Sequence, residues 1–263
     1  MTPIIFSIPL SGERSEQQWE ITQRRLAGTL ASLANQSDPD WRAVITGHER
    51  PEISALSDTR VTFLNARFDK PADKTEFTRD KSRKQKSNYK WIAERGGCDV
   101  VMSDADDLFH RDFVAFIREQ NHPNGHSIHS GYVFDCSSGH LSTIPGAWRN
   151  KFHLICGSSA VLRLEPVEMQ GADCRLNKLK PHDAIFENSE AIGRSLNVIE
   201  WPAVIYVLGG LESVSANIFR TPERQTSLHE IIAKKAIAIT DEIVRSFTLQ
   251  PLINGCETQS SRS

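Results

Sequence analysis

The chain has 263 residues, of which 39% are hydrophobic and 24% charged, and its formal net charge at pH 7 is -2. These are ordinary values for a globular protein that buries one core, and they exclude the general affinity for nucleic acid that a strongly basic chain would have. The five cysteines are an odd number without a Cys-x-x-Cys pair, which is typical of reduced thiols in the cytoplasm rather than of a disulfide framework or a zinc site.

The first third of the chain alternates apolar strands with one amphipathic helix. Its opening apolar run is too short for a signal peptide, and no run approaches the roughly 20 apolar residues of a membrane span. We therefore expect a cytoplasmic protein without an integral membrane segment. Ser15 and Gln18 have the spacing of a capping box, which predicts a helix that ends near Asn35. Short apolar runs predict strands at residues 4–8, 41–46 and 61–64, and their order predicts an α/β fold with a largely parallel sheet.

A basic helix is expected next, closed by the Gly96-Gly97 pair. Its cationic residues are Arg79, Lys81, Arg83, Lys84, Lys86 and Lys90. A charged helix face is most often simply solvated. Here, however, the charges share one sign in a slightly negative chain and lead directly into an acidic cluster. Contact of one or two of these residues with a diphosphate is therefore as well supported as simple solvation of the helix face.

The acidic cluster follows a short apolar run. The run from Val100 to Met102 predicts a buried strand, and Asp104, Asp106 and Asp107 come directly after it. Because side chains alternate along an extended chain, Asp104 and Asp106 are expected to point the same way and Asp107 the other. One aspartate would suffice to cap the helix expected near Phe109, a role open to Asp107. Three carboxylates favour ligands for a divalent cation.

The second half of the chain is predicted to complete one domain. A short helix is expected around residues 113–117, and a hairpin is expected from residues 128–134 and 141–144. An apolar segment at residues 152–164 is broken by Gly157-Ser158-Ser159, which either allows close packing or leaves room for a ligand. His182-Asp183 is expected to open a helix, and strands are expected at residues 198–201 and 203–208. We predict a domain over residues 1–220, a helix over 221–248 packed on it, and a disordered tail over 249–263.

With these residues in place, the chain resembles a nucleotide-sugar-dependent glycosyltransferase of the GT-A fold, in particular the family 2 type, over roughly residues 4–215. The most specific features of this resemblance are the first strand with its polar loop, the helix before Gly97, and the sequence Asp104-Ala105-Asp106-Asp107. The resemblance implies a GT-A, Rossmann-like sheet and a DxD motif that binds Mn²⁺ or Mg²⁺. It also implies that Asp106 is the direct metal ligand, whereas Asp104 binds metal through water or contacts the donor's ribose.

The resemblance further implies how substrates bind. Pro9, Ser11 and Arg14 would meet the nucleotide of a nucleotide-diphosphate sugar donor, and the basic helix would supply Lys81, Arg83 and Lys86 to the diphosphate. Asp183 lies where the family has its catalytic base, which takes the proton of the acceptor hydroxyl. Capping of the following helix by Asp183 remains the alternative. The acceptor would be a glycan, a lipid-linked molecule or a small molecule.

The chain departs from the family pattern in two places. Residues 206–213 lack the histidine that related enzymes use as a further metal ligand, so Glu212, His182 or water would replace it. The loop at residues 47–50 lacks the acidic pair that many members carry. The expected function is a metal-dependent glycosyltransferase of the hexosyltransferase type, with inversion. A metal-dependent phosphohydrolase and a non-catalytic nucleotide- or sugar-binding module remain alternatives.

Overall fold

The structure, a computed structural model, describes residues 2–13, 15–143, 151–171, 174–179, 181–209 and 229–254. Within these residues, seven strands form one sheet in the order β10-β6-β9-β4-β1-β2-β3, and five form another in the order β12-β8-β7-β11-β5. The strands of the larger sheet are β1 (Ile4–Pro9), β2 (Trp41–Gly47), β3 (Val61–Asn65), β4 (Cys98–Met102), β6 (Gly125–Ile128), β9 (Ala160–Leu164) and β10 (Asn197–Ile199). Those of the smaller sheet are β5 (Leu108–Phe109), β7 (Tyr132–Asp135), β8 (His140–Thr143), β11 (Val204–Leu208) and β12 (Ala236–Ile237). The labelled helices are α1 (Glu16–Ala34), α2 (Phe77–Ala93), α3 (Phe113–Gln120), α4 (Arg175–Lys178), α5 (Ile185–Ala191) and α8 (Asp241–Phe247), and residues 229–234 and 250–254 are also helical.

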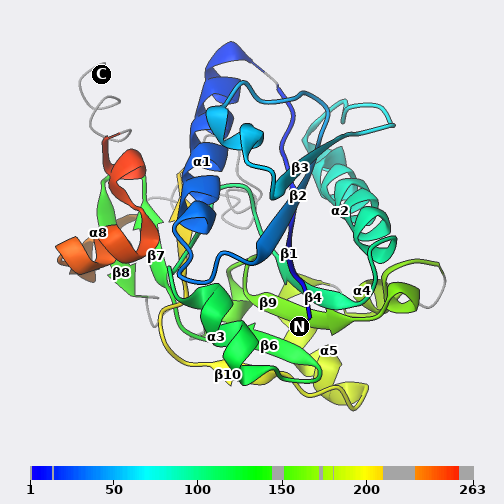
Figure 1. Ribbon diagram of the computed structural model, residues 1–263. Helices are drawn as coiled ribbons and strands as arrows, with labels where there is room; N and C mark the ends of the chain where they lie inside the picture. The colour runs from blue at the N-terminus through cyan, green and yellow to red at the C-terminus, as the bar shows by residue number, and fades with distance from the viewer. Residues whose placement is uncertain are drawn as a thin grey trace.

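The larger sheet is mixed but largely parallel. Strand β1 pairs in parallel with β2 and with β4, β2 pairs in parallel with β3, and β10 pairs in parallel with β6. Only β9 runs against both of its neighbours in this sheet, β4 and β6. The sheet is flanked by helices, so the predicted fold class is confirmed at this level (Figure 1).

Both faces of β1 are covered, which explains why this strand is almost entirely apolar rather than alternating between apolar and polar residues. Phe6 and Ile8 of β1 pack in one buried cluster with side chains of α1 and α3. Ile5, the residue directly before Phe6, packs on the opposite face with Tyr89 and Ile92 of α2. Figure 1 accordingly shows α1 and α2 on opposite sides of β1, β2 and β3.

The strand order reverses between β1 and β4. The chain passes from β1 through α1 to β2 and then to β3, and it returns through α2 to β4 on the other side of β1. Open α/β sheets bind ligands beyond the carboxyl ends of their strands at such a reversal. The segments that leave the sheet there are residues 10–13 after β1 and residues 103–107 after β4.

The predicted start and end of the first helix are confirmed. Ser15 is the N-cap of α1, its hydroxyl oxygen accepts a hydrogen bond from the Gln18 backbone N–H at 3.2 Å, and the helix ends at Ala34. The strands predicted at residues 4–8, 41–46 and 61–64 are β1, β2 and β3. These elements are defined by local apolar runs and a local cap, so the sequence was sufficient to predict them.

The predicted hairpin is only partly right. β7 and β8 do pair antiparallel, but residues 125–128 form β6, which belongs to the larger sheet. Between β6 and β7 the chain passes Gly131 close against the ring of Phe152, where a Cβ atom would lie 2.3 Å from a ring carbon. The small residue lets the chain leave one sheet for the other at this point, and the apolar pattern alone does not mark that change.

The single helix predicted over residues 221–248 is wrong in its described part. Residues 229–234 are helical, but β12 then pairs antiparallel with β8, and Thr240 caps a separate helix, α8. The tail predicted over 249–263 is also wrong at its beginning, because residues 250–254 are helical and Leu249 and Leu252 are buried with Phe247. Residues 210–228 and 255–263 lie outside the described residues. No described helix is both long and apolar enough to cross a membrane.

Candidate functional site

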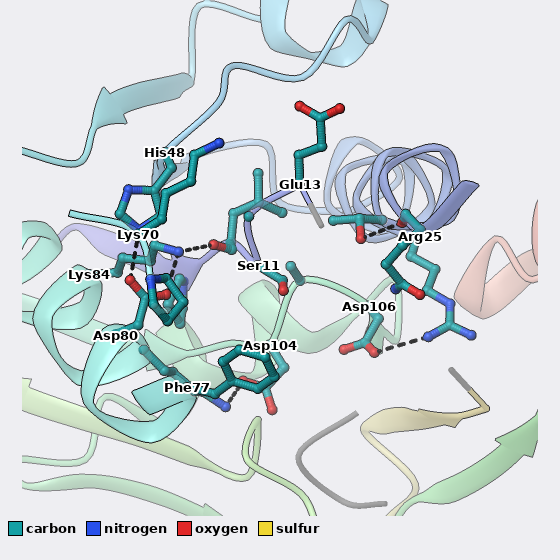
Figure 2. Close-up of a pocket in the computed structure, with 18 of the residues that line it drawn as sticks. Ser11, Glu13, Arg25, His48, Lys70, Phe77, Asp80, Lys84, Asp104 and Asp106 are labelled. Atoms are coloured by element: carbon teal, nitrogen blue, oxygen red, sulfur yellow. Dashed lines mark hydrogen bonds and ion pairs between the residues drawn. The ribbon is translucent and has the colours of Figure 1, made fainter. Parts of the chain in front are cut away.

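A pocket of about 550 Å³ lies at the carboxyl ends of β1 and β4, where the strand order reverses. Its wall is formed by the segment after β1, one face of α1, the first half of α2, the segment after β4 and part of β11. Five of the predicted site residues line it together: Pro9, Ser11, Lys81, Asp104 and Asp106. Figure 2 shows the two aspartates on this pocket with the first-strand loop and α2 beside them.

Asp104 and Asp106 each face a cation across the pocket. The Lys81 Nζ atom lies 2.5 Å from Asp104 Oδ1. The Arg25 Nη1 atom lies 3.7 Å from Asp106 Oδ2 (Figure 2). The two carboxylates retain 25% and 27% of their side-chain exposure, so both remain accessible from the pocket. Both line one pocket, as expected, but residues 105–106 form a turn, so alternation along an extended strand is not what brings them together.

Asp107 has a different, structural position. It is fully buried, and its carboxylate accepts hydrogen bonds from the Ser158 hydroxyl at 2.5 Å and from the Val207 backbone N–H at 3.1 Å. The alternative in which it caps a helix is wrong, because Leu108–Phe109 is strand β5 and α3 begins only at Phe113. Asp107 therefore ties the acidic segment to β11 and to the segment before β9.

Ser158 and its neighbour Gly157 hold the acidic segment close. The Ser158 hydroxyl donates to Asp107 and accepts from the Asp104 backbone N–H at 2.8 Å. A Cβ atom at Gly157 would lie 2.6 Å from Asp104 Oδ2. Of the two interpretations open for these small residues, close packing against the acidic segment is the one the structure supports.

The carboxylates crowd negative charge into a poorly solvated place. Burial raises the pKa of Asp106 to about 6; Asp104 adds to this rise, and Arg25 and Lys81 oppose it. Burial also raises the pKa of Asp107, reinforced by Asp106 and Asp104. Burial alone would lower the pKa of Lys81, but the attraction of the carboxylates outweighs it, so that pKa is raised. An additional cation beside these carboxylates would relieve their mutual repulsion.

A buried ion-pair network, comprising His48, Asp80 and Lys84, forms the opposite wall. Lys84 is 1% exposed, and its ammonium donates to the Leu10 carbonyl oxygen at 2.8 Å and to Asp80 Oδ2 at 2.6 Å. Asp80 Oδ1 lies 2.7 Å from His48 Nε2 (Figure 2). The network fixes the loop after β1 to α2. The i,i+4 spacing of Asp80 and Lys84 was a sequence signal for half of it, because such residues are neighbours on a helix.

Other pocket residues carried no sequence signal. Arg25 comes from α1, and Lys70 precedes α2 and pairs with Glu49, which also accepts a hydrogen bond from the Glu13 backbone N–H at 3.0 Å. Tyr206 comes from β11 in the other sheet. Because these side chains come from segments far apart in the chain, tertiary packing alone brings them together.

Two of the predicted donor-binding residues, Arg83 and Lys86, are described and do not line this pocket. Arg83 stacks its guanidinium on the Phe68 ring, 3.9 Å from the centroid, and Lys86 is exposed. Helical spacing explains the difference, since Lys81 shares its face with residue 84 and not with residues 83 and 86. Arg14 lies outside the described residues.

Asp183 lies in a short 3₁₀ turn, His182–Ala184, directly before α5. The capping alternative is wrong, because Ala184 is the N-cap of α5 and no side chain bonds there. Asp183 and His182 do not line the pocket. The role of Asp183 as a base stays a prediction, and Glu212, the other residue considered as a metal ligand, lies outside the described residues.

The donor set at the end of β4 fits a hard divalent cation that shares its shell with a bound ligand. Among the described residues no three His, Cys, Asp or Glu side chains are placed to hold a metal by themselves. Asp104 and Asp106 offer two carboxylates, and Mg²⁺-type sites typically use one or two carboxylates completed by water and phosphate oxygens. A cation held here would thus depend on what else occupies the pocket.

No protein-family model and no curated protein sequence matches this chain. Among solved structures, a crystal structure of S. aureus TarS matches with a TM-score of 0.40 and 12% identity, covering 93% of this chain and 41% of that one. A shorter form, TarS 1-349, matches with a TM-score of 0.43 and 12% identity, covering 100% and 73%. The crystal structure of 4-diphosphocytidyl-2C-methyl-D-erythritol synthase matches with a TM-score of 0.43 and 10% identity, covering 88% and 98%. Likenesses this weak assign no activity.

Proposed function

We propose that this protein is a metal-dependent glycosyltransferase of the GT-A type, which moves a sugar from a nucleotide-diphosphate sugar to an acceptor hydroxyl with inversion. One observation carries the proposal. Asp104 and Asp106 share a pocket with Lys81 and Arg25 at the reversal of strand order. Carboxylates for a cation and cations for oxyanions are the two requirements of a diphosphate site.

We assign different roles to the residues of this pocket. Asp106 and Asp104 would hold Mn²⁺ or Mg²⁺, and such a cation offsets the negative charge that grows on a departing diphosphate. Lys81 and Arg25 would donate charge-assisted hydrogen bonds to phosphate oxygens, and Pro9 and Ser11 would border the nucleotide. The buried network of His48, Asp80 and Lys84 would keep the loop after β1 in place without touching the reacting atoms.

A thermal-shift screen tests the proposal. The protein is heated with UDP, GDP, CDP or dTDP, each with and without Mn²⁺. A ligand that binds only the folded state stabilises it, by about 2.7 kcal/mol when the ligand concentration is 100 times its Kd. The melting temperature rises as a result. We expect one nucleotide to raise the melting temperature when Mn²⁺ is present. Most of this rise should disappear when EDTA removes the Mn²⁺. Equal shifts with and without Mn²⁺ would remove the metal from the proposal, and no shift with any nucleotide would contradict it.

Product analysis then separates transfer from the alternatives. The protein is incubated with sugar derivatives of the best nucleotide, Mn²⁺ and a panel of glycan, lipid-linked and small-molecule acceptors. The proposal expects a glycosylated acceptor and free nucleoside diphosphate in equal amounts. Inorganic phosphate as the product would indicate a phosphohydrolase, and unchanged substrate despite binding would indicate a binding module.

Asp183→Asn tests the proposed base. We expect the variant to keep Mn²⁺-dependent nucleotide binding but to lose transfer by about 10²–10⁴-fold, the usual contribution of a general base. Glu187→Gln, which neutralises an exposed carboxylate on the following helix, is the matched control and should stay active. Initial rates and nucleotide Kd values are measured for both variants. Full activity of Asp183→Asn would exclude Asp183 as the base.

A further inference from the structure

Lys81 occupies the place that a metal would need at Asp104. Its Nζ atom lies 2.5 Å from Asp104 Oδ1. A divalent cation bound by that oxygen would lie about 2.0–2.6 Å from it, depending on the ion. The ammonium and a metal ion would therefore compete for the same carboxylate oxygen, and they would also repel each other. Direct metal binding to Asp104 Oδ1 thus requires Lys81 to leave.

Lys81 is free to leave without disturbing the fold. Its side chain retains 38% of its exposure, and it extends from α2 into the pocket. One turn further along, Lys84 is buried and holds α2 to the Leu10 carbonyl and to Asp80. The helix backbone is therefore anchored next to a side chain that can rotate. Arg25, at 3.7 Å from Asp106 Oδ2, is less tightly engaged than Lys81 and so obstructs its carboxylate less.

A divalent cation without a bound ligand is only weakly attracted to the pocket, because the two carboxylates at the end of β4 are already paired with cationic side chains. Two of the pocket's carboxylates, Asp104 and Asp106, already face the cationic side chains of Lys81 and Arg25, and the other charged residues that line the pocket are three acids and three lysines. A diphosphate changes this balance, because its oxyanions can accept hydrogen bonds from the Lys81 ammonium and from Arg25. The carboxylate oxygens then become available to a metal, and the metal and the diphosphate also attract each other.

Resting on the proposed function, we propose that Lys81 is a displaceable counterion. It blocks Asp104 to a metal alone and moves to the diphosphate when a ligand carrying one binds. Metal and diphosphate therefore enter this site together, and Lys81 prevents the empty site from retaining free divalent cations. Lys81 is a binding residue in this scheme and takes no part in bond making or breaking.

The test measures Mn²⁺ binding alone, by the loss of the EPR signal of free Mn²⁺ on titration into the protein. The variants are Lys81→Gln, which removes the charge at the site, and Lys86→Gln, which removes an exposed charge from the same helix. We expect Lys81→Gln to bind Mn²⁺ at least about tenfold more tightly than the wild type or Lys86→Gln. The double variant Lys81→Gln/Asp106→Asn should lose this gain, which places it at the acidic segment.

A second arm titrates UDP, GDP, CDP or dTDP in the presence of Mn²⁺ and records the melting temperature. Lys81→Gln should require more nucleotide than the wild type, because the diphosphate has lost a partner. If Lys81→Gln and the wild type bind Mn²⁺ alone equally well or equally poorly, the counterion role is overturned. The proposed function survives that result if the wild type still shows a Mn²⁺-dependent shift with a nucleotide, and it fails too if no such shift occurs.

Discussion

Asp106→Asn is expected to abolish the Mn²⁺-dependent binding of a nucleoside diphosphate and to reduce sugar transfer to background. Asparagine keeps the size of the side chain but removes the negative charge and one strong ligand oxygen. Asp106 lies on the pocket, and its nearest cation is the loosely engaged Arg25, so it is the carboxylate best placed to bind a metal directly. Thermal shift with nucleotide and Mn²⁺ measures the first effect, and product formation measures the second.

Loss of folding would not explain this result, because removing the charge of Asp106 is expected to stabilise the ligand-free protein at pH 7 rather than to destabilise it. Burial raises the pKa of Asp106 from 3.8 to about 6, so the folded state favours the protonated carboxyl. The stability gained from that proton is fully present below pH 3.8 and is lost as the pH rises through about 6. At pH 7 the neutral asparagine should therefore leave the ligand-free protein as stable as the wild type or more stable. The matched control is Asp241→Asn, at a carboxylate that is 95% exposed. A Mn²⁺-dependent shift that is undiminished in Asp106→Asn would contradict the account.

Lys84→Met should destabilise the folded protein by about 3–5 kcal/mol, the usual effect of removing one partner from a buried ion pair. The change leaves Asp80, whose side chain is only 11% exposed, without its ammonium partner, and it frees the Leu10 carbonyl. Because Leu10 begins the loop that borders the pocket, nucleotide affinity should fall as well. Urea unfolding measures the first effect, and thermal shift with nucleotide measures the second.

Lys90→Met, at an exposed position on the same helix, is the matched control and should change the free energy of unfolding by less than about 0.5 kcal/mol. The double variant Lys84→Met/Asp80→Asn should regain part of the lost stability, since the uncompensated carboxylate is removed. If Lys84→Met is as stable as Lys90→Met, the buried network does not hold the loop to α2.

Local chemistry explains what the sequence could predict. The apolar run at residues 100–102 and the cap at Ser15 act on their own neighbours, and both led to the correct elements, β4 and α1. The same holds for Asp104 and Asp106, whose place at the end of a buried parallel strand was enough to predict that they share a site. Helical geometry would also have separated Lys81 from Arg83.

What the sequence could not show depends on contacts between distant segments. Arg25 reaches the pocket from α1, 79 positions before Asp104, and Tyr206 reaches it from a strand of the second sheet. Asp107 was compatible with a cap or a ligand until its partners Ser158, Val207 and Cys156 were in place. The apolar residues over 221–248 have helical spacing and therefore predict one helix. In the described part of this segment, however, pairing of β12 with β8 interrupts the helix.

A crystal structure grown with Mn²⁺ and the nucleoside diphosphate chosen by the thermal-shift screen tests the central claim most directly. Anomalous scattering identifies the position of Mn²⁺ without assumptions about its ligands. The account predicts a manganese peak bonded to Asp106, with Asp104 bonded to it directly or through water, the diphosphate on the same ion and Lys81 on a phosphate oxygen. A nucleotide bound elsewhere, with the Lys81–Asp104 pair intact and no manganese at the end of β4, would contradict it.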